Sequence, residues 1–157
     1  LVASKVLNMG SSSNLSSLTL NVGSEDGIVK NLPVITPDGV IGKTIVIGKS
    51  STLVQLITDV NYRASVRIFP SGNVGILRYL RDDICEVREV QKNAEIQLGD
   101  KVLTSGFSDI YPPNMKIGTV IEIQDEIGSF QKIVKVRISP NIGSLLNVFI
   151  IRGTYDE

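Results

Sequence analysis

The sequence contains no histidine and no tryptophan in its 157 residues. Without histidine, the chain cannot form a Ser-His-Asp or Cys-His catalytic centre or a histidine metal site, and it has no imidazole for general acid–base catalysis. The single cysteine, Cys85, cannot form an internal disulfide. Because Cys85 falls in a run typical of a β-strand, we interpret it as a small buried hydrophobic residue.

An excess of charge of one sign is also absent, because 16 lysines and arginines balance 16 acidic residues. The net charge therefore gives no indication of a nucleic-acid partner or an anionic membrane surface. No run approaches the roughly 18 apolar residues of a membrane span, and no signal peptide is recognisable. Since the sequence begins with Leu1, we expect it to be a fragment whose anchoring or targeting segments lie elsewhere.

The residues that are present have the composition and the alternation of a β protein. Hydrophobic residues make up 42% of the chain and charged residues 20%, which is typical of a globular domain. Apolar and polar residues alternate in runs such as "SLTLNV" (residues 17–22) and "KIVKVRI" (residues 132–138). Turns that contain glycine separate such runs at intervals of roughly 8–12 residues, which predicts an all-β barrel or sandwich.

One strand–turn–strand pattern occurs twice. Residues 34–47 read "VITPDGVIGKTIVI", and residues 102–123 begin with "VLT" and end with "KIGTVIEI". The first hairpin closes with the three residues "PDG", whereas the second uses eleven residues. Positions in the first copy that are identical in the second are Val34, Thr36, Ile41, Gly42, Ile45 and Ile47, which recur as Val102, Thr104, Ile117, Gly118, Ile121 and Ile123.

This repeat predicts two related halves that meet near residues 70–73. We expect a connecting segment at residues 1–14, a first β-barrel at 15–70 and a second at 71–147. The last segment, 148–157, contains a strand that either closes the second barrel or returns to the first. A closed barrel is favoured because it leaves no free sheet edge.

Two motifs resemble binding sites but fit strands and turns better. "GKTIVIGKS" (residues 42–50) is similar to a phosphate loop, but five residues instead of four separate its glycines and β-branched residues fill it. Asp82 and Asp83 are adjacent, so on a strand their carboxylates would point to opposite faces. We therefore predict no metal site and no cofactor.

Ser105, in "TSG", is the remaining candidate nucleophile. It would need a base within hydrogen-bond reach, and Lys101 and Lys116 are the candidates by proximity. A Ser-Gly turn explains the motif more simply, because Gly106 readily adopts a positive φ. We therefore predict that the protein is not an enzyme.

The eleven-residue connection of the second hairpin carries Phe107, Ile110 and Tyr111 next to two prolines at positions 112 and 113. The prolines restrict the backbone and lower the entropy lost on holding one shape. Either the apolar side chains fold back to plug a barrel end, or they form a preformed contact patch for a partner. Two further aromatic residues are weaker candidates for partner binding, because their strands could equally bury them: Tyr79 and Phe130.

Several short motifs occur in a characteristic order: "GSEDGI", "TPDGVIGK", "LITD", "GDKVLTSG" and "YPPNMKIG". In this order and spacing they resemble the extracytoplasmic region of the MreC family of bacterial rod-shape-determining proteins. The resemblance runs from about residue 6 to about residue 151 and is poor at residues 78–93. Asn114 stands where such proteins usually carry a glycine. The resemblance implies two six-stranded β-barrels in tandem, arranged as in trypsin-like proteases but without catalytic residues.

The resemblance also implies a function. Such proteins are scaffolds of the cell-elongation machinery, which builds lateral peptidoglycan and maintains cell shape. They bind and are expected to activate a class B penicillin-binding transpeptidase, and the full-length proteins associate with MreD and MreB and self-associate. The implied location is the outer face of the cytoplasmic membrane (the periplasm in Gram-negative bacteria), with a single-pass anchor in the full-length protein only.

A glycan-binding module that recognises the cell wall directly is the alternative. Sugar sites usually use aromatic platforms, and aromatic residues make up only 5% of this chain. The sequence therefore favours the scaffold interpretation.

Overall fold

The structure is a computed structural model that describes residues 1–11 and 15–152. Its described part is all-β, and no helix in it is long and apolar enough to cross a membrane. Two 3-10 helices, η1 (Ser24–Asp26) and η2 (Ile142–Ser144), accompany the strands. The strands are β1 (Val2–Ser11), β2 (Ser16–Leu20), β3 (Pro33–Thr36), β4 (Gly39–Ile47), β5 (Thr52–Leu56), β6 (Arg63–Phe69), β7 (Val74–Arg81), β8 (Ile84–Gln91), β9 (Lys101–Thr104), β10 (Lys116–Asp125), β11 (Gln131–Ile138) and β12 (Asn147–Ile150).

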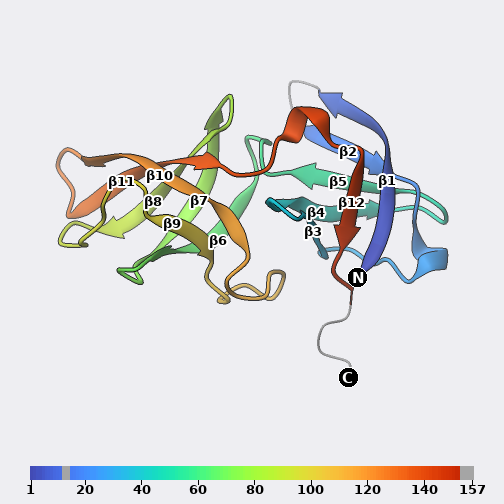
Figure 1. Cartoon of the computed structure of the whole chain (residues 1–157), viewed down its shortest axis with the longest axis horizontal. Helices are drawn as coiled ribbons and strands as arrows, with labels where there is room; N and C mark the ends of the chain where they lie inside the picture. The colour runs from blue at the N-terminus through green and yellow to red at the C-terminus, as the bar shows by residue number, and fades with distance from the viewer. Residues whose placement is uncertain (12–14, 153–157) are drawn as a thin grey trace.

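These strands form two closed six-stranded barrels that lie side by side (Figure 1). Barrel 1 has the strand order β1-β12-β3-β4-β5-β2, and barrel 2 has the order β10-β11-β8-β7-β6-β9. Neighbouring strands are antiparallel throughout both barrels. Closure pairs the strand edges that an open sheet would expose. The prediction of two six-stranded β-barrels is confirmed.

The two barrels have the same topology if β12 is counted as the first strand of barrel 1. In barrel 2, the first strand β6 pairs with β7 and β9, and in barrel 1 β12 pairs in the same way with β1 and β3. The C-terminal strand thus takes the place that β6 has in barrel 2. The register of β12 with β1 pairs Ile150 with Val2, so both ends of the described chain belong to barrel 1.

The barrel boundaries differ from the expected ranges at both ends of barrel 1. Residues 2–11 are strand β1 of that barrel, where a connecting segment was expected, and β12 returns to it. Strand β6, expected in the first barrel, belongs to barrel 2, because its buried residues Val66 and Ile68 join the core there and its edge pairs with β9. The chain therefore passes between barrels within residues 57–62, ahead of the expected boundary at 70 and 71.

Each barrel surrounds its own hydrophobic core, which is built from every second residue along the strands, because these side chains point inward. In barrel 1, Leu18 and Leu20 of β2 are fully buried while Thr19 between them is partly exposed. The cores meet at the junction, because Val40 of the β3–β4 hairpin and Ile57 after β5 belong to the cluster that fills barrel 2. Ile142 of η2 packs against both clusters. Buried apolar contacts therefore join the barrels directly.

Candidate functional site

The long connection of the second hairpin, residues 105–115, is fastened at its stem by Thr104. The Thr104 hydroxyl donates to the carbonyl oxygen of Pro112 (2.6 Å) and accepts from the backbone N–H of Met115 (2.9 Å). The N–H of Asn114 donates to the Thr104 carbonyl oxygen at 2.9 Å. Asn114 has φ 68°, a left-handed conformation that glycine and asparagine adopt most readily, so asparagine can stand in the glycine position noted above.

Tyr111 anchors the loop from inside barrel 2. Its side chain is 2% exposed, and its hydroxyl oxygen accepts a hydrogen bond of 2.5 Å from the hydroxyl of Tyr62, which is fully buried. The two rings meet edge to face, with centroids 6.5 Å apart. Burial raises the pKa of both phenols, so both stay protonated and the bond persists at neutral pH. Ile110 is half-buried and packs against the same core.

Phe107 lies on the same loop and points outward, with 70% of its surface exposed. Its ring is 5.3 Å from the guanidinium carbon of Arg67, a cation–π contact. The Phe107 N–H donates to the hydroxyl oxygen of Ser105 (3.1 Å), which donates in turn to the hydroxyl of Ser65 (2.8 Å). Of the two roles that the sequence left open, Tyr111 takes the first because it plugs the barrel, whereas Phe107 is exposed to solvent and its role as a partner contact stays a prediction.

Ser105 therefore has a structural role at the base of the loop. Its hydroxyl is paired with Ser65 and with the Phe107 N–H, and neither Lys101 nor Lys116 contacts it. Cys85 is buried in barrel 2, and burial raises the pKa of its thiol to about 12. In the described part of the chain, no group of three or more acidic, cysteine or histidine side chains is placed to hold a metal ion.

The two weaker candidates lie away from the loop. Tyr79, on β7, is half-buried, and its hydroxyl donates to the carbonyl oxygen of Asp82 at 3.0 Å. Partial burial, followed by the nearby carboxylate of Asp82, raises the pKa of Tyr79. Phe130 is 89% exposed and lies at the tip of the β10–β11 hairpin with Ile127, whose side chain is fully exposed. Figure 1 shows this hairpin at the outer end of barrel 2, so the five candidates do not form one patch.

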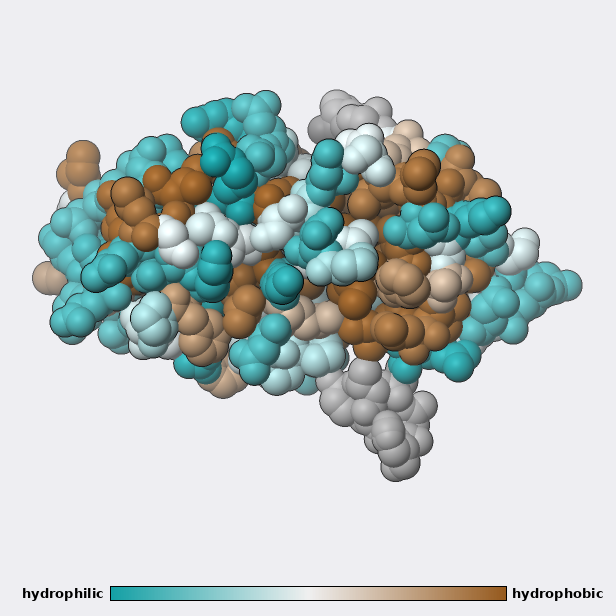
Figure 2. Space-filling model, in the orientation of Figure 1, coloured by the Kyte–Doolittle hydropathy of each residue, from teal (hydrophilic) through white to brown (hydrophobic). Residues whose placement is uncertain are grey.

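Hydrophobic area alone does not single out the loop. In the view of Figure 2, apolar surface is broadest over barrel 1, whereas barrel 2 mixes apolar and hydrophilic side chains. What distinguishes the loop is that its exposed ring stands on a segment anchored by the buried residues Tyr111 and Thr104, which lowers the entropy lost on binding. Sequence reasoning missed Arg67, which contacts Phe107. The alternation of β6 is the signal that places Arg67 outside the barrel.

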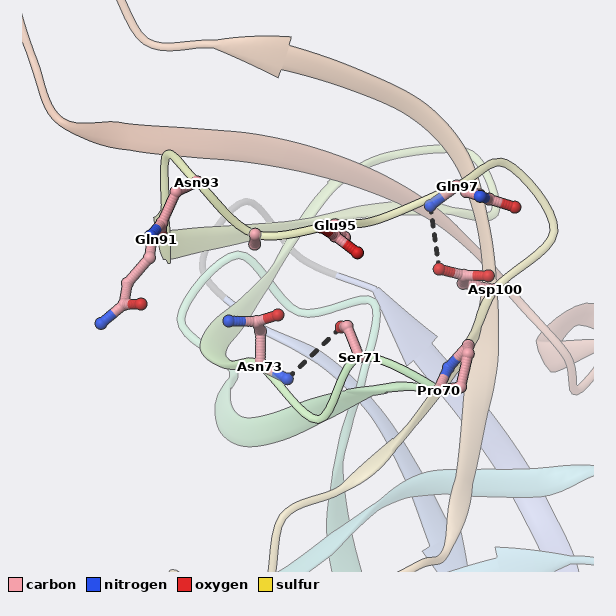
Figure 3. Close-up of a pocket in the computed structure, with 9 residues that line it drawn as sticks. Pro70, Ser71, Asn73, Gln91, Asn93, Glu95, Gln97 and Asp100 are labelled. Atoms are coloured by element: carbon pink, nitrogen blue, oxygen red, sulfur yellow. Dashed lines mark hydrogen bonds between the residues drawn. The ribbon is translucent and has the colours of Figure 1, made fainter.

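A polar cleft of about 560 Å³ lies at the end of barrel 2, between the β6–β7 turn and the segment after β8 (Figure 3). Ser71 and Asn73 reach into it from the turn, and Glu95 faces them from the opposite segment. Other polar side chains that line the cleft are Gln91, Asn93, Gln97 and Asp100. No aromatic ring is among the lining residues, so the cleft lacks the platform on which a sugar ring stacks and does not favour the glycan interpretation.

Comparison with known sequences gives a consistent family. Residues 6–152 match the family described as "Rod shape-determining protein MreC, barrel core". The cell shape-determining protein MreC of Listeria monocytogenes is 27% identical over 148 residues, which cover 88% of this chain and 50% of the relative. Escherichia coli MreC is 22% identical over 143 residues, which cover 87% and 37%. The chain spans about half the length of these relatives or less.

Solved structures share the fold. The crystal structure of MreC from Pseudomonas aeruginosa has a TM-score of 0.89 at 20% identity and covers 96% of this chain and 97% of that one. A Listeria monocytogenes MreC structure has a TM-score of 0.89 at 23% identity, with 96% and 74% covered. MreC in a complex between penicillin-binding protein PBP2 and MreC from Helicobacter pylori has a TM-score of 0.75 at 20% identity, with 93% and 94% covered.

The family match extends over both barrels and both copies of the sequence repeat. It also contains the loop at residues 105–115, which makes the second copy longer than the first. It also includes β12, so the return of the C-terminal strand to barrel 1 lies within the matched residues. The resemblance noted in the sequence is thereby confirmed, and the chain belongs to the MreC family of rod shape-determining proteins.

Proposed function

We propose that this chain is a non-enzymatic scaffold domain that binds a class B penicillin-binding transpeptidase through the loop at residues 105–115. The observation that carries the proposal is the outward Phe107, 70% exposed, on a loop that Tyr111 locks into the core. An aromatic side chain on a rigid support is a typical anchor of protein interfaces, because little conformational freedom is lost on binding. The Helicobacter pylori relative, solved in complex with PBP2, supports this partner class.

The chemistry of the domain supports binding rather than catalysis. The chain has no histidine, the Ser105 hydroxyl is engaged by Ser65, and the Cys85 thiol is buried with a raised pKa. None of these groups provides an activated nucleophile. We therefore propose that the domain acts through its surface.

Activation of the transpeptidase needs only a difference in affinity. If the domain binds an open arrangement of the enzyme's non-catalytic region more tightly than a closed one, it shifts the population toward the open form. We infer from the same resemblance that the chain self-associates and that the full-length protein associates with MreD and MreB and carries a single-pass membrane anchor. A solved relative described as the major periplasmic domain of a cell shape-determining filament supports an extracytoplasmic location.

Binding to the soluble ectodomain of the cognate transpeptidase, measured by isothermal titration calorimetry, tests the proposal. We expect Phe107→Ser to weaken binding by about tenfold or more, as loss of an interface anchor does. Phe130→Ser is the matched control, because it removes an even more exposed aromatic ring at the outer end of barrel 2. Ile110 and Tyr79 are half-buried and are expected to contribute less.

Three outcomes separate the alternatives. Binding that only Phe107→Ser weakens supports the loop as the contact. Binding that only Phe130→Ser weakens moves the contact to the β10–β11 hairpin and keeps the scaffold function. If the wild-type chain does not bind the ectodomain at all, the proposed function is contradicted.

A further inference from the structure

The outer surface of β6, β9 and β10 carries a regular arrangement of cationic and apolar side chains, which we name the β6–β9–β10 face. Strand register places Leu103 between Arg67 and Lys116, and it pairs Lys101 with Phe69 on β6 and Thr119 on β10. On β6 and β9 these side chains alternate with buried residues, and on β10 a register shift puts two buried residues between Lys116 and Thr119. All six therefore point away from the barrel. Each apolar side chain of this face thus has a cation beside it: Leu103 pairs with Arg67 and Lys116, and Phe69 pairs with Lys101.

The cations of this face have no ion-pair partner in the part of the chain that the structure describes. In the described residues, Arg67, Lys101 and Lys116 form no ion pair; Arg67 instead donates to the Gly72 carbonyl oxygen (2.8 Å) and lies over Phe107. On the other strands of barrel 2 most cations are paired with carboxylates, and Arg81 of β7 is the exception among the described residues. Those pairs are Arg78–Glu86, Arg88–Glu86, Arg88–Glu126, Lys132–Asp125, Lys135–Glu122 and Arg137–Asp83.

A groove of about 490 Å³ runs along this face at the junction of the barrels. Lys101 and Lys116 line it together with Phe69 and Leu103, and Gly118, which has no side chain, also lines it. Asp38, on the β3–β4 turn of barrel 1, is the single carboxylate among the lining residues. The lining of the groove therefore combines apolar side chains with two cations and one carboxylate.

We propose that the β6–β9–β10 face binds an extended acidic segment of the transpeptidase ectodomain, in which carboxylates flank an apolar side chain. The apolar side chain would contact Leu103, and the carboxylates would pair with Lys116 on one side and Arg67 on the other. Acidic residues two positions before and two positions after the apolar one point to the same face of an extended chain as it does. The cations, two strand spacings or about 10 Å apart, have long side chains that can reach both carboxylates. Phe107, over Arg67, makes this face continuous with the contact loop. The inference rests on the proposed function and specifies the partner's chemistry.

The test compares two charge reversals of equal size in the binding assay with the transpeptidase ectodomain. Lys101→Glu with Lys116→Glu reverses two charges in the groove, and Lys30→Glu with Lys92→Glu reverses two exposed lysines outside it. We expect the groove variant to bind about tenfold more weakly and to lose most of the salt dependence of binding, and the control to stay within about twofold. All four side chains are exposed, so both variants should keep the wild-type melting temperature.

Equal effects of the two reversals, or none, would overturn the proposal while leaving the scaffold function intact. If the wild-type chain does not bind the ectodomain, a synthetic peptide with glutamates two residues before and two residues after a leucine decides the inference separately. If the wild-type chain binds the peptide and the groove variant does not, the result supports the proposal that this face binds an acidic segment. If the wild-type chain does not bind the peptide, the proposal is rejected. Vesicles of phosphatidylcholine and phosphatidylglycerol provide the last arm, because binding to them that depends on Lys101 and Lys116 would reassign the face to lipid and overturn the proposal.

Discussion

The repeated hairpins, β3–β4 in barrel 1 and β9–β10 in barrel 2, share their strands and differ in their turns. A glycine lets the next strand approach closely in both. A Cβ atom on Gly42 would collide with the carbonyl oxygen of Gln55 on β5, and one on Gly118 would collide with that of Arg137 on β11. Since β5 and β11 have equivalent places in their barrels, the repeated glycine has one physical role.

The repeated isoleucines also have equivalent places. Ile41 and Ile117 are both fully buried, each in the core of its own barrel. The register of the second strand shifts at Ile45 in barrel 1 and at Ile121 in barrel 2, so both copies carry a β-bulge at the same position. A bulge bends a strand and increases its twist, as closure into a small barrel requires.

The turns show where the two copies diverge. Thr36 accepts one hydrogen bond, from the Asp38 N–H (3.1 Å), at a partly exposed three-residue turn. Its counterpart Thr104 is buried and fastens both sides of the eleven-residue loop. The strands of the repeat thus specify a barrel, and the difference in turn length adds an anchor in the core, Tyr111, and an exposed ring, Phe107.

Substitution of the two repeated glycines by alanine should have the largest effect on stability, and it tests whether the two hairpins are equivalent. Gly42→Ala and Gly118→Ala should each lower the free energy of unfolding by about 4 kcal/mol or more, because the collision is with backbone that cannot rotate away. Urea denaturation followed by circular dichroism measures both. Gly143→Ala is the control, since its Cβ would have only an ordinary contact with Asn141, and should change stability by about 0.5 kcal/mol at most. A mild effect at one of the two repeated glycines would mean that the copies are not equivalent.

Truncation of Tyr111 should have the next largest effect and should be confined to barrel 2. Tyr111→Ala opens a cavity beside Tyr62 and should lower the free energy of unfolding by about 3 kcal/mol. Tyr111→Phe keeps the ring in the core but leaves the Tyr62 hydroxyl without its partner, so about 1 kcal/mol should be lost. Amide hydrogen exchange should show the loss of protection around residues 105–115. If Tyr111→Ala leaves stability unchanged, the loop is not anchored by this side chain.

The threonine pair gives the smallest and most specific comparison. Thr104→Val leaves the Pro112 carbonyl oxygen and the Met115 N–H without their partner and should lower the free energy of unfolding by about 2 kcal/mol. Thr36→Val, at the partly exposed turn, should change it by about 0.5 kcal/mol or less, because water replaces the lost partner. Parallel thermal melts of the two variants measure this difference. Similar losses in both would show that the short turn depends on its threonine as strongly as the long loop does.

Much of the fold could be predicted from the sequence. Alternation identified strands such as β11, and the order of the short motifs indicated the family and its two barrels. The boundaries were harder to predict, because β6 and β12 carry ordinary strand alternation that does not say which barrel they join. Only pairing decides that, and β12 pairs with β1, more than a hundred residues away in the sequence.

The candidate site divides in the same way. The sequence indicated the loop at residues 105–115 from its length and its apolar side chains, but it could not separate Tyr111 from Phe107. Both are aromatic residues in one loop, and their different exposure depends on Tyr62 of a distant segment, which pairs with Tyr111 across the core. The sequence also could not predict that the cations of the β6–β9–β10 face lie together, because Arg67, Lys101 and Lys116 become neighbours only when three strands pair in register.

By itself, the sequence determined that the chain is all-β, that it lacks a histidine-based catalytic centre and that one hairpin is present twice, because these follow from composition and from local periodicity. Tertiary structure alone decided which strands close which barrel, which loop side chain is buried and which cations lie unpaired on one face. These features depend on contacts between distant segments, and no local pattern carries that information.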